Sequence, residues 1–137
     1  MAAEVTIIEL FNGGRPIRYT IANNTTGNDT LKGTVMQISG DRTVSAHSGI
    51  DEAIAGILTS EKLGGDGSTT VSVYTAGIFD MTAAAAGVTA LGARCAGSGT
   101  ANMITVADAT DLLQSSDIGQ CLEAHGNNEV AAVRINK

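Results

Sequence analysis

The sequence of 137 residues has few of the side chains from which most catalytic and nucleic-acid-binding sites are built. It contains two histidines, two cysteines, one proline and no tryptophan, and its eight basic residues stand against fourteen acids. Active sites need titratable groups that converge on one place, and phosphate backbones attract Lys and Arg. The net charge of −6 therefore argues against a nucleic-acid partner, and we expect a protein that is not an enzyme.

The two cysteines do not indicate a cofactor. Cys95 and Cys121 are 26 residues apart and match neither a metal-ligand spacing nor a C-x-x-C redox motif. We expect two small buried or half-buried thiols and no cofactor. A disulfide between them stays open, because it requires that their strands meet.

The sequence also lacks the signals of export and membrane insertion. A signal peptide typically begins with basic residues followed by an apolar stretch, and the first twenty residues lack this pattern. No apolar run approaches the length of a membrane span. We therefore expect a soluble protein that is made in a cytoplasm and has no membrane partner.

Glycine and β-branched residues dominate what is present. Short apolar or alternating segments are separated by Gly, Asn and Asp turn signals about every 8–12 residues. This pattern predicts a mainly β fold, a small compact β-barrel or sandwich with one or two short helices and an extended N-terminal arm. The expected strands, in chain order, are 5–10, 17–21, 33–38, 53–58, 69–74, 77–81, 91–96, 102–106, 118–123 and 129–135.

Two segments carry helical signals. Asp108 precedes residues 109–113 as a capping residue, and Asp111 suits the first turn, so this is the best helix candidate. Residues 51–55 fit one helical turn, but we favour a buried strand over 53–58. We find no exact internal repeat, and we expect a first unit of residues 1–20 (arm or first hairpin) followed by one β-rich domain of residues 21–137.

Three polar groups invite a chemical interpretation, and each has a simpler structural one. Segment 64–68 lacks the lysine of a phosphate-binding loop, so we expect a hairpin-type turn. Residues 41–48 place acid, serine and His47 in one loop, whereas catalytic triads join separate segments, so we expect a polar loop histidine. The carboxylates of 108–117 lack the alternating spacing of a calcium loop and fit helix capping better. His125 falls in a predicted turn.

The N-terminal segment is the main candidate for binding. Residues 2–11 form an apolar-leaning strand at a chain end, and they either pair with 17–21 in a hairpin or add a strand to another protein's sheet. The candidate contact residues are Glu4, Val5, Thr6, Ile7, Ile8, Glu9, Leu10, Arg15 and Arg18.

A series of short pieces runs along nearly the whole chain in a characteristic order. They are Thr6-Ile7-Ile8-Glu9-Leu10, Pro16-Ile17-Arg18-Tyr19, Lys32-Gly33-Thr34, Asp41-Arg42-Thr43, Ala55-Gly56-Ile57, Glu61-Lys62, Asp66-Gly67-Ser68-Thr69, Gly77-Ile78-Phe79-Asp80, Ile118-Gly119, Leu122-Glu123 and Val133-Arg134-Ile135. In this order the chain resembles the capsid decoration (cement) proteins of tailed bacteriophages.

The resemblance implies a structural protein of the virion without catalytic residues. Such proteins assemble as trimers on the outer surface of an icosahedral capsid and hold the expanded head against internal DNA pressure. Their N-terminal arm commonly pairs with the major capsid protein, and by position residues 2–10 would be that arm. The alternative is a small β-fold adhesion or carbohydrate-binding module, which the shortage of Trp and Tyr for sugar stacking disfavours.

Overall fold

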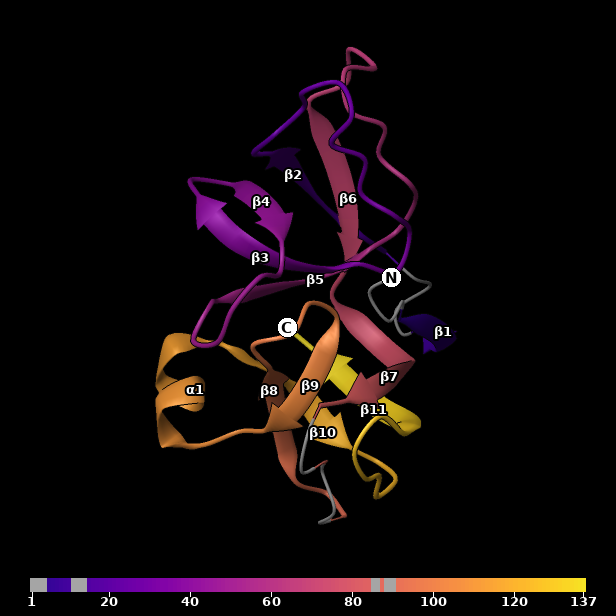
Figure 1. Ribbon diagram of the computed structural model, residues 1–137, viewed down its shortest axis with the longest axis vertical. Helices are drawn as coiled ribbons and strands as arrows, with labels where there is room; N and C mark the ends of the chain where they lie inside the picture. Colours follow the sequence, from indigo (N-terminus) through magenta and orange to yellow (C-terminus); the bar gives the residue numbers. More distant parts are fainter. Residues whose placement is uncertain (1–4, 11–14, 85–86, 88–90) are drawn as a thin grey trace.

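The computed structural model describes residues 5–10, 15–84, 87 and 91–137, and the expected mainly β, barrel-forming architecture is confirmed. Figure 1 shows two barrels, one above the other, with one short helix beside the lower one. The strands are β1 Thr6–Leu10, β2 Ile17–Ile21, β3 Val35–Gly40, β4 Thr43–Ala46, β5 Ile54–Leu58, β6 Thr70–Tyr74, β7 Ala76–Ala83, β8 Arg94–Gly97, β9 Met103–Val106, β10 Asp117–Cys121 and β11 Val130–Asn136, and the helix is α1 Ala109–Gln114.

Strands β2 to β6 close into the first barrel, in the order β2-β4-β3-β5-β6. β2 runs parallel to β4, and the other pairings are antiparallel. Alternation explains β6, where Val71 and Val73 are buried while Thr70 lies in solvent. These valines pack with Met36 and Leu58 in a core of its own.

Strands β7 to β11 form the second barrel. They are ordered β7-β11-β10-β8-β9, and the ring closes because β9 also pairs, in parallel, with β7. β7 alternates along all eight residues, so Phe79, Met81 and Ala83 point inward. β1 adds to the outer edge of β7 as a sixth strand.

The two barrels have the same topology. In each, the first strand is parallel to the third and antiparallel to the fifth, and the second strand pairs with the third and the fourth. Individual hydrogen bonds repeat as well. Gly33 N donates to Leu58 O at 3.0 Å, and Gly92 N donates to Cys121 O at 2.9 Å. A repeat is therefore present in the backbone although the sequence shows no exact one.

Two glycines mark the same point in the two barrels. A Cβ at Gly56 in β5 would lie 2.2 Å from Tyr74 O, and a Cβ at Gly119 in β10 would lie 2.1 Å from Arg134 O. Each glycine thus lets the fourth strand approach the fifth more closely than a side chain permits.

A shared core joins the barrels. Val35, Ile54 and Ile57 of the first barrel pack in one buried cluster with Phe79 and other residues of the second. The buried Val35 N donates to Asn102 Oδ1 at 2.8 Å, so a polar contact also crosses this junction.

Several local expectations are confirmed, and of the two alternatives for residues 2–11 the hairpin with 17–21 does not form. α1 begins after Asp108, whose side chain forms a capping box with Asp111, and residues 54–58 form a strand as favoured. β1 does not form a hairpin with β2 but pairs with β7, which is far away in the sequence. The expected boundary between residues 20 and 21 falls inside β2. Residues 11–14, between β1 and β2, lie outside the described residues.

Candidate functional site

β1 is held at both ends by the body of the protein. Its register places Thr6 opposite Asp80 and Leu10 opposite Gly77, with a bulge between Ile7 and Glu9. Just before the strand, Val5 is buried and its N–H donates to Gly33 O at 3.0 Å. The segment 5–10 is therefore an integral strand of the sheet.

Two glycines make room for this strand. Gly33 has φ +85°, and a Cβ there would lie 2.4 Å from Val5 O. Gly77 has φ +153°, and a Cβ there would lie 2.5 Å from Glu9 O. Because an L side chain at either position would collide with β1, the body is shaped to receive it.

The other edge of β1 faces away from β7. Successive residues of an antiparallel strand turn their N–H and C=O groups to opposite sides. Because the N–H of Val5 points away from β7, to Gly33 O, the backbone groups of Ile7 two residues later point outward as well. Ile8 lies at the bulge and is 52 % exposed. An edge strand of this kind can pair with a strand of another protein.

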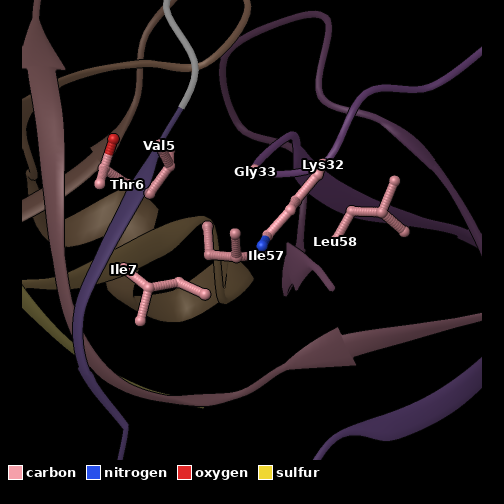
Figure 2. A pocket seen from close by; sticks show the side chains of 7 residues that line it. All are labelled: Val5, Thr6, Ile7, Lys32, Gly33, Ile57 and Leu58. Atoms are coloured by element: carbon pink, nitrogen blue, oxygen red, sulfur yellow. The ribbon is translucent and has the colours of Figure 1, made fainter. Parts of the chain in front are cut away.

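A cavity of about 320 Å³ adjoins this edge. Figure 2 shows the Lys32 side chain extending into it from beside Gly33, toward Ile57 at the end of β5. The lining is Val5, Thr6, Ile7, Lys32, Gly33, Ile57 and Leu58. The cavity thus offers apolar surface and one cation next to the outward backbone of Ile7.

The structure divides the predicted contact residues between two places. Thr6, Ile8 and Glu9 are exposed on β1, whereas Ile7 and Leu10 are half-buried against the core and Val5 is buried. Arg15 and Arg18 are exposed at the start of β2 in the other barrel. Glu4 lies outside the described residues. Sequence reasoning missed Lys32 and Ile57, and the glycine after Lys32 was the available signal of a close approach.

The glycine-rich segment 64–68 is a turn built around a buried lysine. Lys62 is 5 % exposed, and its Nζ donates to Asn24 Oδ1 at 2.5 Å, Leu63 O at 2.6 Å and Asp66 Oδ1 at 2.6 Å. The hydrogen bond from Lys62 holds the pKa of Asp66 below its usual range. Because Lys62 Nζ is bound by these three groups of the protein itself, Lys62 stabilises the conformation of the 64–68 loop.

His47 lies in the loop directly after β4, where a polar loop histidine is expected from the sequence, but the residue is buried. It is 2 % exposed, its Nε2 lies 2.6 Å from Gly49 O, and burial lowers its pKa. A Cβ at Gly97 of β8 would lie 2.4 Å from Nε2, so the ring sits at the junction of the barrels. The sequence could not indicate this burial, because its cause lies in the other barrel.

The cysteines are two buried thiols, as expected from the sequence. Burial raises the pKa of Cys95 to about 12 and also raises that of Cys121, which disfavours a reactive thiolate. Cys121 Sγ lies 3.5 Å from Nδ1 of His125, which is itself buried. This contact is therefore a packing arrangement and not an activated nucleophile.

The three carboxylates of 108–117 have structural partners. Asp108 and Asp111 cap α1, as expected. Asp117 is bridged by Arg94 and by Lys137, and although burial opposes it, this pairing lowers the pKa of Asp117. Within the part of the chain that the structure describes, no group of three His, Cys, Asp or Glu side chains is arranged to hold a metal.

Among the described residues, no helix has the length and apolar character needed to cross a membrane. Comparison of the chain with models of known protein families and with curated protein sequences finds no match. The edge of β1 and its cavity are therefore the candidate binding site.

Proposed function

We propose that this protein is a capsid decoration protein, which binds the outer surface of an icosahedral tailed-phage capsid and stabilises the expanded head. The observation that carries the proposal is the open edge of β1, with outward backbone groups at Ile7 beside an apolar cavity. A strand of the major capsid protein would pair with this edge. The order of sequence pieces that resembles decoration proteins supports the same conclusion.

The architecture is suited to this role. β1 is fixed to the body at Gly33 and Gly77, so a capsid strand that pairs with it is coupled directly to the second barrel. Many copies on a lattice turn weak single contacts into strong collective binding. The protein would sit on the virion surface as a homotrimer at three-fold and quasi-three-fold positions.

The test uses expanded heads of the phage whose genome encodes this chain, assembled without it. The full chain is expected to occupy regular surface sites, seen by cryo-electron microscopy, and to raise the temperature at which the heads rupture. Ile7→Pro removes an N–H that faces away from β7, so binding should fall at least about tenfold. Because the Ile7 side chain also packs against the core, the variant is less stable, and binding is compared well below its melting temperature.

Val130→Ala is the control, because Val130 is an exposed apolar residue on β11, away from the edge of β1. It should bind as the wild type does. Failure of the wild type to occupy any regular site would overturn the proposed function. Undiminished binding of Ile7→Pro would instead show that the capsid contact is elsewhere. Point substitution is preferable to deletion of residues 1–10, which would remove the whole of β1, including the core contact of Leu10.

A further inference from the structure

The repeated topology locates a second strand-binding edge. In the second barrel, β7 pairs with β9 through Thr82 and Ala83, and the part of β7 before this pairing receives β1. In the first barrel, β2 pairs with β4 through Thr20 and Ile21 in the same parallel manner. Thr20 of β2 therefore corresponds to Thr82 of β7. Two residues earlier in each strand, Arg18 corresponds to Asp80.

The counterpart edge of β2 carries no strand among the described residues. β2 has β6 on one side along Ile17 to Thr20, whereas β4 reaches only Thr20 and Ile21 on the other. Thr20 N donates to Arg42 O at 2.8 Å on the β4 side, so the backbone groups of Arg18 point to that side too. Its carbonyl accepts from Arg42 Nη2 at 3.1 Å, and its N–H is turned outward.

The chemistry of this edge is basic. Arg15, Arg18 and Arg42 are exposed, and none of them forms an ion pair with a described residue, including the neighbouring Asp41. The whole chain has a net charge of −6. Three guanidinium groups near one strand edge of an acidic protein, none of them in an ion pair with a described residue, are complementary to carboxylates on an incoming strand.

Apolar surface lies next to the same edge. Ile17 and Ile38 are 42 % and 43 % exposed, and both line a cavity of about 480 Å³ that extends to the junction with the second barrel. Pro16, directly before β2, corresponds to Ile78 of β7 and has no N–H to donate. A strand bound to the edge of β2 can therefore pair with it over a short stretch only. The site therefore fits an extended segment that combines acidic and apolar residues.

From these observations we propose that the edge of β2 at Pro16–Tyr19 binds an extended, acid-bearing strand of a partner protein. By the register of β1 on β7, the residue of the bound strand that corresponds to Thr6 lies opposite Arg18. This inference goes beyond the proposed function, because it concerns the other barrel and does not require that the partner be a capsid protein.

The probe is a synthetic peptide with the sequence of residues 2–10, titrated into the ¹⁵N-labelled full chain, whose own β1 occupies β7. The peptide has two carboxylate side chains and the apolar pattern of a strand that binds the counterpart edge. Shifts of amide signals are expected at Arg18 and its neighbours. The double variant Arg15→Gln/Arg18→Gln should weaken binding about tenfold, whereas Arg134→Gln on β11 should not.

Two modified probes separate strand pairing from simple charge attraction. A peptide N-methylated at the position of Thr6 keeps both charges but cannot donate to Arg18 O, and it should not bind. Pro16→Ile restores an N–H at the position of Ile78 and should strengthen binding of the unmodified peptide. Equal binding of the methylated peptide, shifts confined to β7, or no binding to either the wild type or Pro16→Ile would overturn the proposal.

Duplex DNA also binds clusters of arginines, so a short duplex is tested as the last ligand in the same titration. Binding of a short duplex at Arg18 with no binding of the peptide would overturn the proposal in favour of phosphate recognition. Failure of the capsid experiment leaves this titration unaffected, because no phage head takes part in it.

Discussion

The two barrels share a topology but use their edges and their buried polar groups differently. The first strand of the second barrel receives β1, whereas the corresponding stretch of β2 carries Pro16 and exposed arginines. Asn102 and Arg42 occupy the same hairpin position, both with positive φ, yet Asn102 is buried and Arg42 is exposed. The barrel scaffold therefore fixes where an edge forms, and the side chains decide what binds there.

The largest expected effect tests whether the two barrels depend equally on their matched glycines. Gly56→Ala and Gly119→Ala each place a Cβ within about 2.2 Å of a carbonyl oxygen of the next strand. Each should cost about 3 kcal/mol or more of the free energy of unfolding, because strand backbones cannot move apart cheaply. Urea unfolding measures this. Gly49→Ala and Gly99→Ala, where nothing lies within 4 Å, are the controls.

If only one of the two glycine variants is destabilised, the barrels share a topology but are not packed equally at these glycines. If, in each variant, all spectroscopic probes report the same unfolding transition, the shared core couples the barrels into one cooperative unit.

An intermediate effect tests the buried polar contact at the junction. Asn102→Gly keeps a backbone suited to φ +62° but removes the acceptor of Val35 N, so it should cost about 1–3 kcal/mol in urea unfolding. Arg42→Gly, at the matched and exposed position, should stay within about 0.5 kcal/mol of the wild type. Equal effects of the two substitutions would show that the strained turn, and not the Val35 contact, is responsible.

Local structure could be read from the sequence, whereas the partners of each segment could not. Alternation identifies β6 and β7, and Asp108 identifies the start of α1, because these signals act within a few residues. The pairing of β1 with β7 joins distant segments, and it is neither of the two alternatives that the sequence suggests for residues 2–11. The repeat is not visible in the sequence, because it rests on backbone register and on a few glycines separated by unequal spacings.

For the same reason, only part of the candidate binding site at β1 could be predicted from the sequence. The residues of β1 were identified as a candidate from their position and apolar pattern. The cavity beside them depends on Lys32 and on Ile57 of another strand, which come together only in the fold. The edge of β2 was represented by Arg15 and Arg18, but its meaning depends on comparison with β7.

The smallest expected effect concerns acidification and distinguishes the junction from the barrels themselves. Because burial lowers the pKa of His47, the unfolded chain binds a proton more readily at this residue than the folded chain does. The stabilising contribution is present above the unfolded pKa of about 6.5 and is lost as the pH falls below it. Asp66 and Asp117, whose pKa values are also lowered, lose their contributions only in the more acidic range where carboxylates titrate. Chemical unfolding of the wild type and of His47→Gln between pH 7.5 and 5 should give a steeper decline for the wild type, and parallel declines would mean that the junction does not resist protonation of His47.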